Sequence, residues 1–160
     1  MQKRLAANSW RQRVNQQLPL LGHRNWIAIV DSAYPWQTAP GIETIATGAA
    51  QLEVVDFVLK AVKKARHVRP LVYLDAELAD LPEADAHGVT AYQKKLHKLL
   101  PPGAVQTVPH EEIISMLNEA GKTFRVLILK STLTLPYTSV FVQLDCGYWN
   151  AEAESRLRGR

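Results

Sequence analysis

The chain has 160 residues, 47% of them hydrophobic and 21% charged, which suits a folded domain with an ample core and excludes a disordered chain. The net charge is +4, but part of the basic excess lies near the two ends, which favours charged, solvated termini over a nucleic-acid surface. The single cysteine, Cys146, excludes an intrachain disulfide framework, and we expect it to be a small buried hydrophobe rather than a nucleophile. There is no secretory signal, and no apolar run approaches the ~20 residues of a membrane span, so we expect a cytoplasmic protein.

Hydrophobic periodicity and helix-breaking residues divide the chain into alternating elements. In chain order these are a helix over 5–18, strands over 26–30 and 42–46, a helix over 50–66, a strand over 71–74, a helix over 89–100, a strand over 105–108, a helix over 111–120, and strands over 124–129 and 140–144. The first helix carries Trp10, Val14 and Leu18 on one face, and the second has an apolar stripe. Its members are Leu52, Val55, Leu59 and Val62.

Strands separated by helices predict an α/β fold, with three α/β/α layers around a mostly parallel sheet of about six strands. We expect one domain over residues 1–160, with an N-terminal helical extension over 1–17 and a polar tail over 150–160. In such sheets ligands bind at the carboxyl ends of strands. Asp31 directly follows the strand over 26–30, and His23 precedes it.

The sequence has no glycine-rich nucleotide loop, nucleophile elbow or zinc-protease motif. Its acidic cluster contains Asp75, Glu77, Asp80, Asp85 and His87. A divalent metal could bind such oxygens, but their loose spacing favours a solvated acidic loop. We therefore expect neither a metal site nor a cofactor.

Two candidate residues flank the strand over 26–30, and pattern alone does not establish a role for either. From pattern alone, a surface or capping histidine is the favoured explanation of His23. A helix or turn cap is likewise the favoured explanation of Asp31.

The segment GHRNWIAIVDSAYP, residues 22–35, is similar to the N-terminal signature of the D-ribose pyranase / L-fucose mutarotase family. That signature has a Gly-His pair, a short polar step, a strand, an Asp and a Pro. Further segments resemble the family in order and with similar spacing, so that the resemblance spans roughly residues 20–147. They are IETIATGAAQLEVVDFVLKAV, RPLVYLDAEL, VPHEEIISMLNEA and LPYTSVFVQLDCGY.

The resemblance implies that His23 is the proton donor of a sugar-binding site. The substrate-binding residues that it implies are Asp31, His110, Tyr137, Thr138 and Ser139. His110 is similar to the histidine of the ribose pyranases, where fucose mutarotases tend to carry an arginine. Ser139 departs from the Asn that is usual in the family, so its contact with the sugar is expected to differ or to use water.

The implied function is that of an isomerase, a monosaccharide mutarotase or pyranase that interconverts anomers, or pyranose and furanose rings, through the open-chain sugar. One group protonates the ring oxygen while another removes the anomeric hydroxyl proton, and an imidazole with a pKa near ~6.5 can do either. Trp36 could stack on a sugar face, but packing within its loop is the role that we expect.

The resemblance also implies a homo-oligomer with sites near subunit contacts. From the placement of the basic residues and the absence of a long apolar run, we expect no nucleic-acid or membrane partner. The alternative that we keep open is a non-catalytic sugar-binding or regulatory subunit with the same fold, which the replacement at Ser139 favours.

Overall fold

A six-stranded sheet forms the middle layer of the protein in the computed structural model. The structure describes residues 2–103 and 105–159, and for residues 2–8 it describes the backbone only. The strand order of the sheet is β2-β5-β1-β6-β3-β4. The strands are β1 (Trp26–Val30), β2 (Ile42–Ala46), β3 (Val68–Asp75), β4 (Val105–Val108), β5 (Val126–Lys130) and β6 (Val140–Cys146). β6 runs antiparallel to both of its neighbours, β1 and β3, and the other pairings are parallel.

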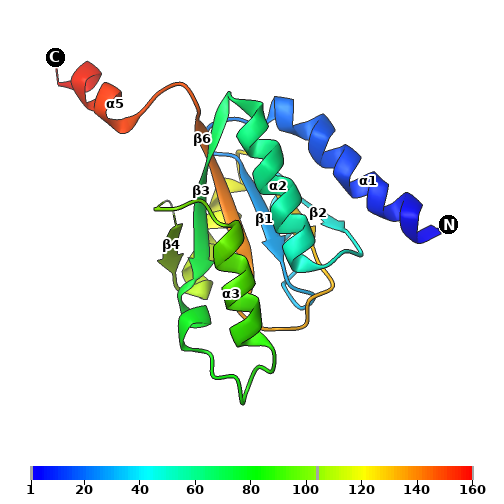
Figure 1. The fold of residues 1–160 in the computed structure, drawn as a ribbon. Helices are drawn as coiled ribbons and strands as arrows, with labels where there is room; N and C mark the ends of the chain where they lie inside the picture. The colour runs from blue at the N-terminus through cyan, green and yellow to red at the C-terminus, as the bar shows by residue number, and fades with distance from the viewer. Residues whose placement is uncertain (1, 104, 160) are drawn as a thin grey trace.

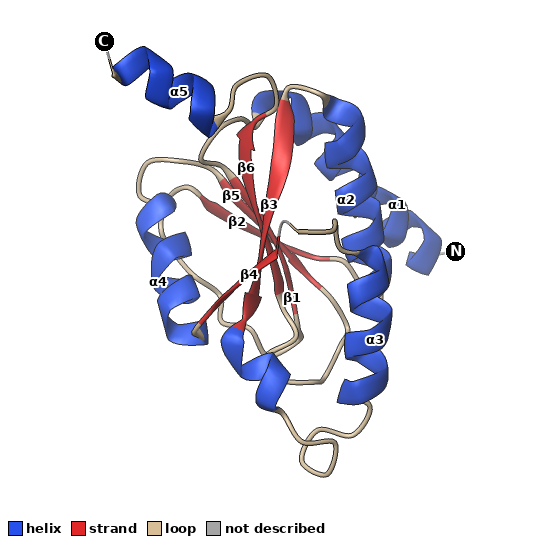
Figure 2. Cartoon of the chain, turned by 60° about the vertical axis from the view of Figure 1, so that its left-hand side comes forward, coloured by secondary structure: helices blue, strands red, loops and turns tan. Residues whose placement is uncertain are grey.

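The helices form two layers, one on each face of the sheet. They are α1 (Gln2–Gln17), α2 (Gln51–Ala65), α3 (Val89–Leu99), α4 (His110–Ala120) and α5 (Ala151–Arg158), with 3-10 turns η1 (Leu18–Leu20) and η2 (Ala76–Asp80). Figures 1 and 2 show α2 and α3 on one face, with α1 beside α2, and α4 on the opposite face. The predicted three-layer α/β/α class with a mostly parallel sheet is therefore confirmed.

The central strand β1 is buried on both faces, because its alternating side chains enter two separate cores. Ile27 and Ile29 pack in the core beneath α2 and α3. The intervening Ala28 packs on the other face, in the core that contains Ile113 and Leu117 of α4. The helices thus hold the sheet rigidly and leave its two edges, at the strand ends, for polar side chains.

The face that α2 buries differs from the predicted stripe. Val55 and Val62 are buried as expected, but Val54 and Val58 are buried as well, and Leu52 and Leu59 are only partly buried. Figure 2 shows α2 between the sheet, α1 and α3, so a wider face is covered than packing against a sheet alone would require.

Both ends of the chain are helical. In α1, Trp10 and Val14 are buried as predicted, whereas Leu18 is buried in η1, since Pro19 ends the α-helical geometry. The residues expected to be a polar tail form α5, which buries no side chain and projects from the sheet in Figure 1. The basic side chains of Lys3 and Arg4, and all of Arg160, lie outside the described residues.

Cys146, the last residue of β6, is only partly buried, so the prediction of a buried hydrophobe is wrong. Gly147, the next residue, lies so close to the backbone carbonyl of Arg66 that a Cβ atom at position 147 would clash with it.

Within the described residues, none of the helices is long and apolar enough to cross a membrane.

Candidate functional site

Polar residues gather at one edge of the sheet, where three parallel strands end and the antiparallel β6 begins. Asp31 follows β1, Asp75 ends β3, and His110 opens α4 two residues after β4. Ser139 immediately precedes β6. Because β6 runs antiparallel to β1 and β3, its start lies at the same edge as their carboxyl ends. This edge is the usual position for a ligand site in such sheets.

Asp31 and Ser139 are joined directly. The Ser139 hydroxyl donates to Oδ1 of Asp31 over 3.2 Å, and both residues are buried. The pair follows from the register, since Ile29 of β1 lies beside Val140 of β6. Asp31 therefore has one lone-pair direction occupied and keeps other acceptor positions for ligand hydroxyls.

Asp75 and His110 form a second joined pair, in which Nδ1 of His110 lies 2.9 Å from Oδ1 of Asp75. The Asp75 side chain is 0% exposed, and among the described residues its Oδ2 has no hydrogen-bond partner. The pKa of Asp75 is raised to about 6, chiefly by burial and further by the charges of Glu77 and Asp31, against the opposing hydrogen bond and charge of His110.

The prediction of a solvated acidic loop is wrong for Asp75. β3 continues to Asp75, one residue beyond its predicted end, so this carboxylate belongs to the strand and to the site. The signal was available, because Asp75 follows an apolar run in the same way as Asp31 does. Sequence spacing grouped Asp75 with the acidic residues that follow it, whereas its hydrogen-bond partner is His110.

Glu77 fixes the backbone of His110. Both of its carboxylate oxygens lie 3.1 Å from the backbone nitrogen of His110 and accept its hydrogen. A carboxylate at this place satisfies a free N–H of the first turn of α4 and interacts favourably with the helix dipole. His110 is consequently held at its backbone by Glu77 and at its ring by Asp75.

Aromatic side chains flank the His110 ring. The rings of Tyr137 and Tyr34 approach it edge-on, with centroid separations of 5.3 Å and 6.3 Å. Tyr34 is buried and donates its hydroxyl hydrogen to Gln37 over 2.6 Å. Its pKa lies well above the ordinary value because of burial, and then because of the charges of Asp75 and Asp31. Tyr34 is a site residue that the sequence reasoning missed.

Tyr137 and Thr138 lie in the turn before β6 and differ in exposure. Tyr137 is partly exposed and has φ +56°, a left-handed conformation that a bulky residue rarely adopts. Thr138 is fully buried and donates its hydroxyl to the carbonyl of Leu135 over 2.7 Å. Its carbonyl accepts hydrogen bonds from Gln51 and Tyr92. The hydrogen of the Thr138 hydroxyl and the Thr138 carbonyl oxygen are thus both used within the chain, and the hydroxyl oxygen can still accept a hydrogen bond.

His23 lies at the opposite edge of the sheet. Its Nδ1 is 3.0 Å from Oδ1 of Asp145, while Arg69 donates to Oδ2 of Asp145 at 3.0 Å and 2.5 Å. Burial alone would raise the pKa of Asp145, but the hydrogen bonds from Arg69, the Cys146 backbone and His23, with the Arg69 charge, bring it below its usual value.

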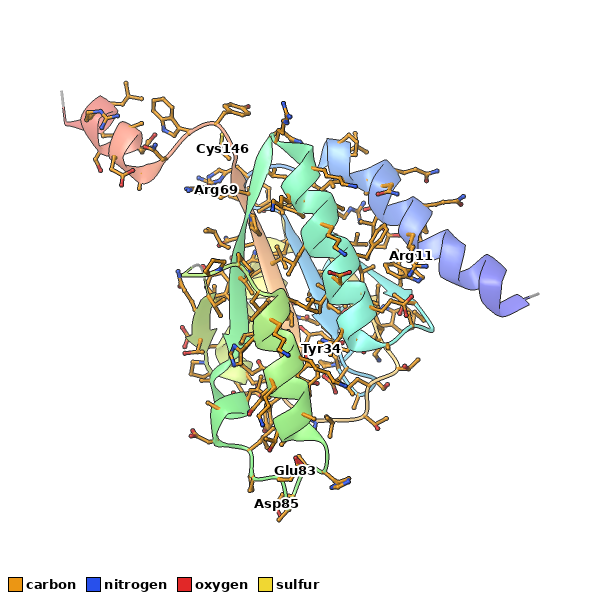
Figure 3. All side chains as sticks on the ribbon, viewed as in Figure 1. Arg11, Tyr34, Arg69, Glu83, Asp85 and Cys146 are labelled. Carbon is orange, nitrogen blue, oxygen red and sulfur yellow. The ribbon has the colours of Figure 1, made fainter. Side chains whose placement is uncertain are left out.

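β1 separates His23 from Asp31, and a five-residue strand spans roughly 16 Å. In Figure 3, Arg69 and Cys146 lie at the end of the sheet from which α5 departs, and Tyr34 lies nearer the other end. The His23 side chain is 59% exposed and lines a groove of about 720 Å³ with residues of α5. One copy of the chain therefore brings Asp31, Ser139, His110 and Tyr137 together but not His23.

Two further expectations concern Trp36 and metals. Trp36 is 80% exposed, so the expected packing within its loop is not observed. Over residues 2–103 and 105–159, no group of three or more His, Cys, Asp or Glu side chains is arranged to hold a metal ion.

Comparison with known proteins identifies the fold to which this edge site belongs. No protein-family model matches the sequence, and no curated protein matches it. Among solved structures, Bacillus subtilis RbsD complexed with D-ribose superposes with a TM-score of 0.60 at 17% identity, over 83% of this chain and 91% of that chain.

Two fucose mutarotase-type structures give similar results. The Streptococcus pneumoniae fucose mutarotase in complex with L-fucose has a TM-score of 0.54 at 16% identity, over 83% of this chain and 91% of that one. FucU from Bifidobacterium longum has a TM-score of 0.52 at 14% identity, over 84% and 94%. The chain has the fold of the RbsD and FucU proteins, so the resemblance in the sequence is confirmed at the level of the fold.

Proposed function

We propose that this protein is a monosaccharide mutarotase or pyranase, an isomerase acting on ribose, fucose or a related sugar. The observation that carries the proposal is the cluster of Asp31, Ser139, His110 and Tyr137 at the carboxyl edge of the sheet. The fold supports it, because solved proteins of this fold are bound to D-ribose and L-fucose. Carboxylate, hydroxyl, imidazole and phenol groups suit a ligand made of hydroxyl groups.

The reaction opens and recloses the sugar ring. The anomeric hydroxyl loses its proton to a base, the bond between C1 and the ring oxygen breaks, and the ring oxygen takes a proton from an acid. Asp31 and Ser139 orient sugar hydroxyls, and the ring of Tyr137 covers one side of the sugar. Each positioned acid or base contributes about 10²- to 10⁴-fold to such a reaction.

His23 is proposed as the proton donor, and it acts from a second copy of the chain. Within one copy it lies at the wrong edge of the sheet, so the proposal requires a homo-oligomer in which that edge approaches the Asp31 edge of a neighbour. Asp145 holds Nδ1 of His23 and leaves Nε2 to face the sugar. We expect the oligomer to act in the cytoplasm.

The test is saturation-transfer NMR of anomeric exchange on ribose and fucose. The wild type should accelerate exchange, while His23→Ala and His110→Ala should each lose most of the acceleration. Asp56→Asn is the matched control, since within the described residues Asp56 pairs with Lys60 alone, on the surface of α2. No acceleration by the wild type on any monosaccharide would overturn the proposal.

Subunit complementation tests the shared site. Co-expression of His23→Ala chains with His110→Ala chains should restore part of the activity, because some sites then receive an intact His23 from one chain and an intact His110 from the other. If the mixture stays as inactive as each variant alone, His23 does not act across a subunit contact.

The second candidate function is a non-catalytic sugar-binding or regulatory subunit. It is favoured by Ser139, a short hydroxyl side chain whose hydrogen is already donated to Asp31. Saturable sugar binding in calorimetry, together with an unchanged exchange rate in NMR, would select this candidate.

A further inference from the structure

We infer that Asp75 is a positioning residue that holds the His110 ring with a proton on Nδ1, so that Nε2 of His110 is the base for the anomeric hydroxyl. The inference deepens the proposed function and rests on it for the identity of the substrate. The Asp75–His110 pair is complete within one copy of the chain, unlike the contact that His23 requires.

The first support is the burial of the carboxylate. Asp75 has no exposed side-chain surface, and its hydrogen bond to Nδ1 of His110, 2.9 Å long, is the one that the described residues provide to its side chain. An ionised carboxylate in such surroundings is stable only if a donor faces it. The ionised form of Asp75 therefore favours the His110 tautomer with the proton on Nδ1, which leaves the Nε2 lone pair free.

The second support is that the ring is restrained from several sides. Glu77 holds the His110 backbone nitrogen with both carboxylate oxygens, while Tyr34 and Tyr137 contact the ring edge-on. With Nδ1 directed at Asp75 in the interior, Nε2 is directed away from that buried carboxylate. A base fixed in this way needs little reorganisation when the sugar binds.

The surroundings of Asp75 keep its proton affinity close to that of an imidazole. The groups that face it are His110 of α4, Glu77 of η2, Asp31 after β1, and the buried hydroxyls of Tyr34 and of Tyr92 in α3. Burial, aided by the two nearby carboxylates, holds the pKa of Asp75 at about 6. Asp75 is thus ionised at neutral pH and can stabilise the imidazolium that forms when Nε2 takes a proton.

The proton balance of the step is complete. Nε2 of His110 takes the anomeric hydroxyl proton, C1 becomes a carbonyl carbon, and the electron pair of the broken C1–O bond passes to the ring oxygen. The ring oxygen takes one proton from the acid, which the proposed function assigns to His23 of a second copy. Rotation about C1–C2 and the reverse transfers close the ring on either face.

The test compares Asp75→Asn, His110→Gln and the double variant with wild type, with Asp56→Asn as the control. Asp75→Asn should lower kcat about 10²-fold and change KM far less, because no ligand atom is lost. If Asp75 acts through His110, the double variant should have the same kcat as His110→Gln alone. A further large loss in the double variant, or full activity of Asp75→Asn, would overturn the inference.

A spectroscopic measurement tests the positioning without any sugar. At alkaline pH, the ¹⁵N signals of the His110 ring should identify Nδ1 as the protonated nitrogen in the wild type. In Asp75→Asn the amide can rotate its NH₂ group toward Nδ1 and favour the Nε2–H tautomer. A wild-type spectrum with Nε2 protonated would overturn the inference even if Asp75→Asn failed to fold.

The two tests separate the failure of the inference from that of the proposed function. Absence of exchange on every sugar, with Nδ1 of His110 protonated, refutes the mutarotase and leaves the positioning of the ring intact. Sugar exchange that is unaffected by Asp75→Asn refutes the role of Asp75 and leaves the mutarotase intact.

Discussion

Ser139 donates a hydrogen bond of 3.2 Å to Asp31, which joins the residue after β1 to the residue before β6. The resemblance placed both Asp31 and Ser139 at the site. Nothing in the sequence near either residue predicts that the two side chains are in contact, because they are 108 residues apart. The antiparallel pairing of β1 with β6 creates it. Because of this hydrogen bond, mutation of Ser139 can test the effect of having Ser where the resemblance leads us to expect Asn.

Ser139→Ala should lower the free energy of unfolding by about 1 kcal/mol, because a buried carboxylate oxygen loses its donor. Ser139→Asn should lower it further, since the Ser139 side chain is fully buried and the larger amide must displace its neighbours. Urea unfolding at neutral pH measures both differences.

Ser115→Ala is the control for Ser139→Ala. The Ser115 hydroxyl donates to a carbonyl of its own helix at an exposed position, so its loss should change the unfolding free energy by less than about 0.5 kcal/mol. Equal effects at positions 115 and 139 would contradict a special role for the contact with Asp31.

Tyr137 adopts φ +56°, so Tyr137→Gly should be more stable than Tyr137→Ala by about 1 kcal/mol, because glycine has no Cβ to oppose that conformation. Both variants lose the contact of the Tyr137 ring with His110 and should bind sugar weakly. Urea unfolding of the two variants measures the backbone effect free of the side-chain loss.

Tyr148 supplies the matched pair for this comparison, since it is an exposed tyrosine that is not among the residues with positive φ. There the glycine variant should be no more stable than the alanine variant, because glycine adds freedom only to the unfolded chain. If glycine were the less stable replacement at position 137 as well, backbone strain would be excluded there.

His67 should make stability depend on pH. Its Nδ1 lies 2.9 Å from the carbonyl of Ala65 and its Nε2 lies 2.9 Å from the carbonyl of Leu21, and only a protonated ring donates from both nitrogens. The pKa of His67 is raised, chiefly by the Ala65 carbonyl against the effect of burial, with help from Leu21 and Leu18.

A raised folded-state pKa has a defined sign. The stabilisation by His67 is fully present below its unfolded pKa of about 6.5 and is lost as the pH rises through the higher folded value. The urea midpoint of the wild type should therefore fall over this range relative to that of His67→Gln, which does not titrate. If the difference in urea midpoint between the two proteins stayed constant with pH, the two ring nitrogens of His67 would not both be donors.

Much of the fold was predictable because it depends on local periodicity. Trp10 and Val14 are buried at the predicted helical spacing, and Ile27 to Ile29 form the predicted buried strand. The errors lie where an element contacts several neighbours at once. In α2, Val54 and Val58 are buried because α1 and α3 cover the helix in addition to the sheet. The periodicity of α2 itself does not predict these neighbours.

The candidate site was predictable only in part. Asp31, His110, Tyr137 and Ser139 were expected from the resemblance and lie at one edge of the sheet. Asp75 was assigned to a solvated loop, and it is the most deeply buried carboxylate of the site. Sequence spacing could not identify its partner, because His110 is 35 residues away and reaches Asp75 only through the parallel pairing of β3 with β4.

The sequence by itself determined the α/β class, the order of the elements up to β6 and the residue types able to move protons, since these follow from side-chain chemistry and short-range spacing. Only the tertiary structure decided which of them meet. Strand direction places Asp31, Asp75, His110 and Ser139 at one edge and His23 with Asp145 and Arg69 at the other. A rigid strand cannot bring its two ends together, so His23, which precedes β1, and Asp31, which follows it, belong to two different surfaces.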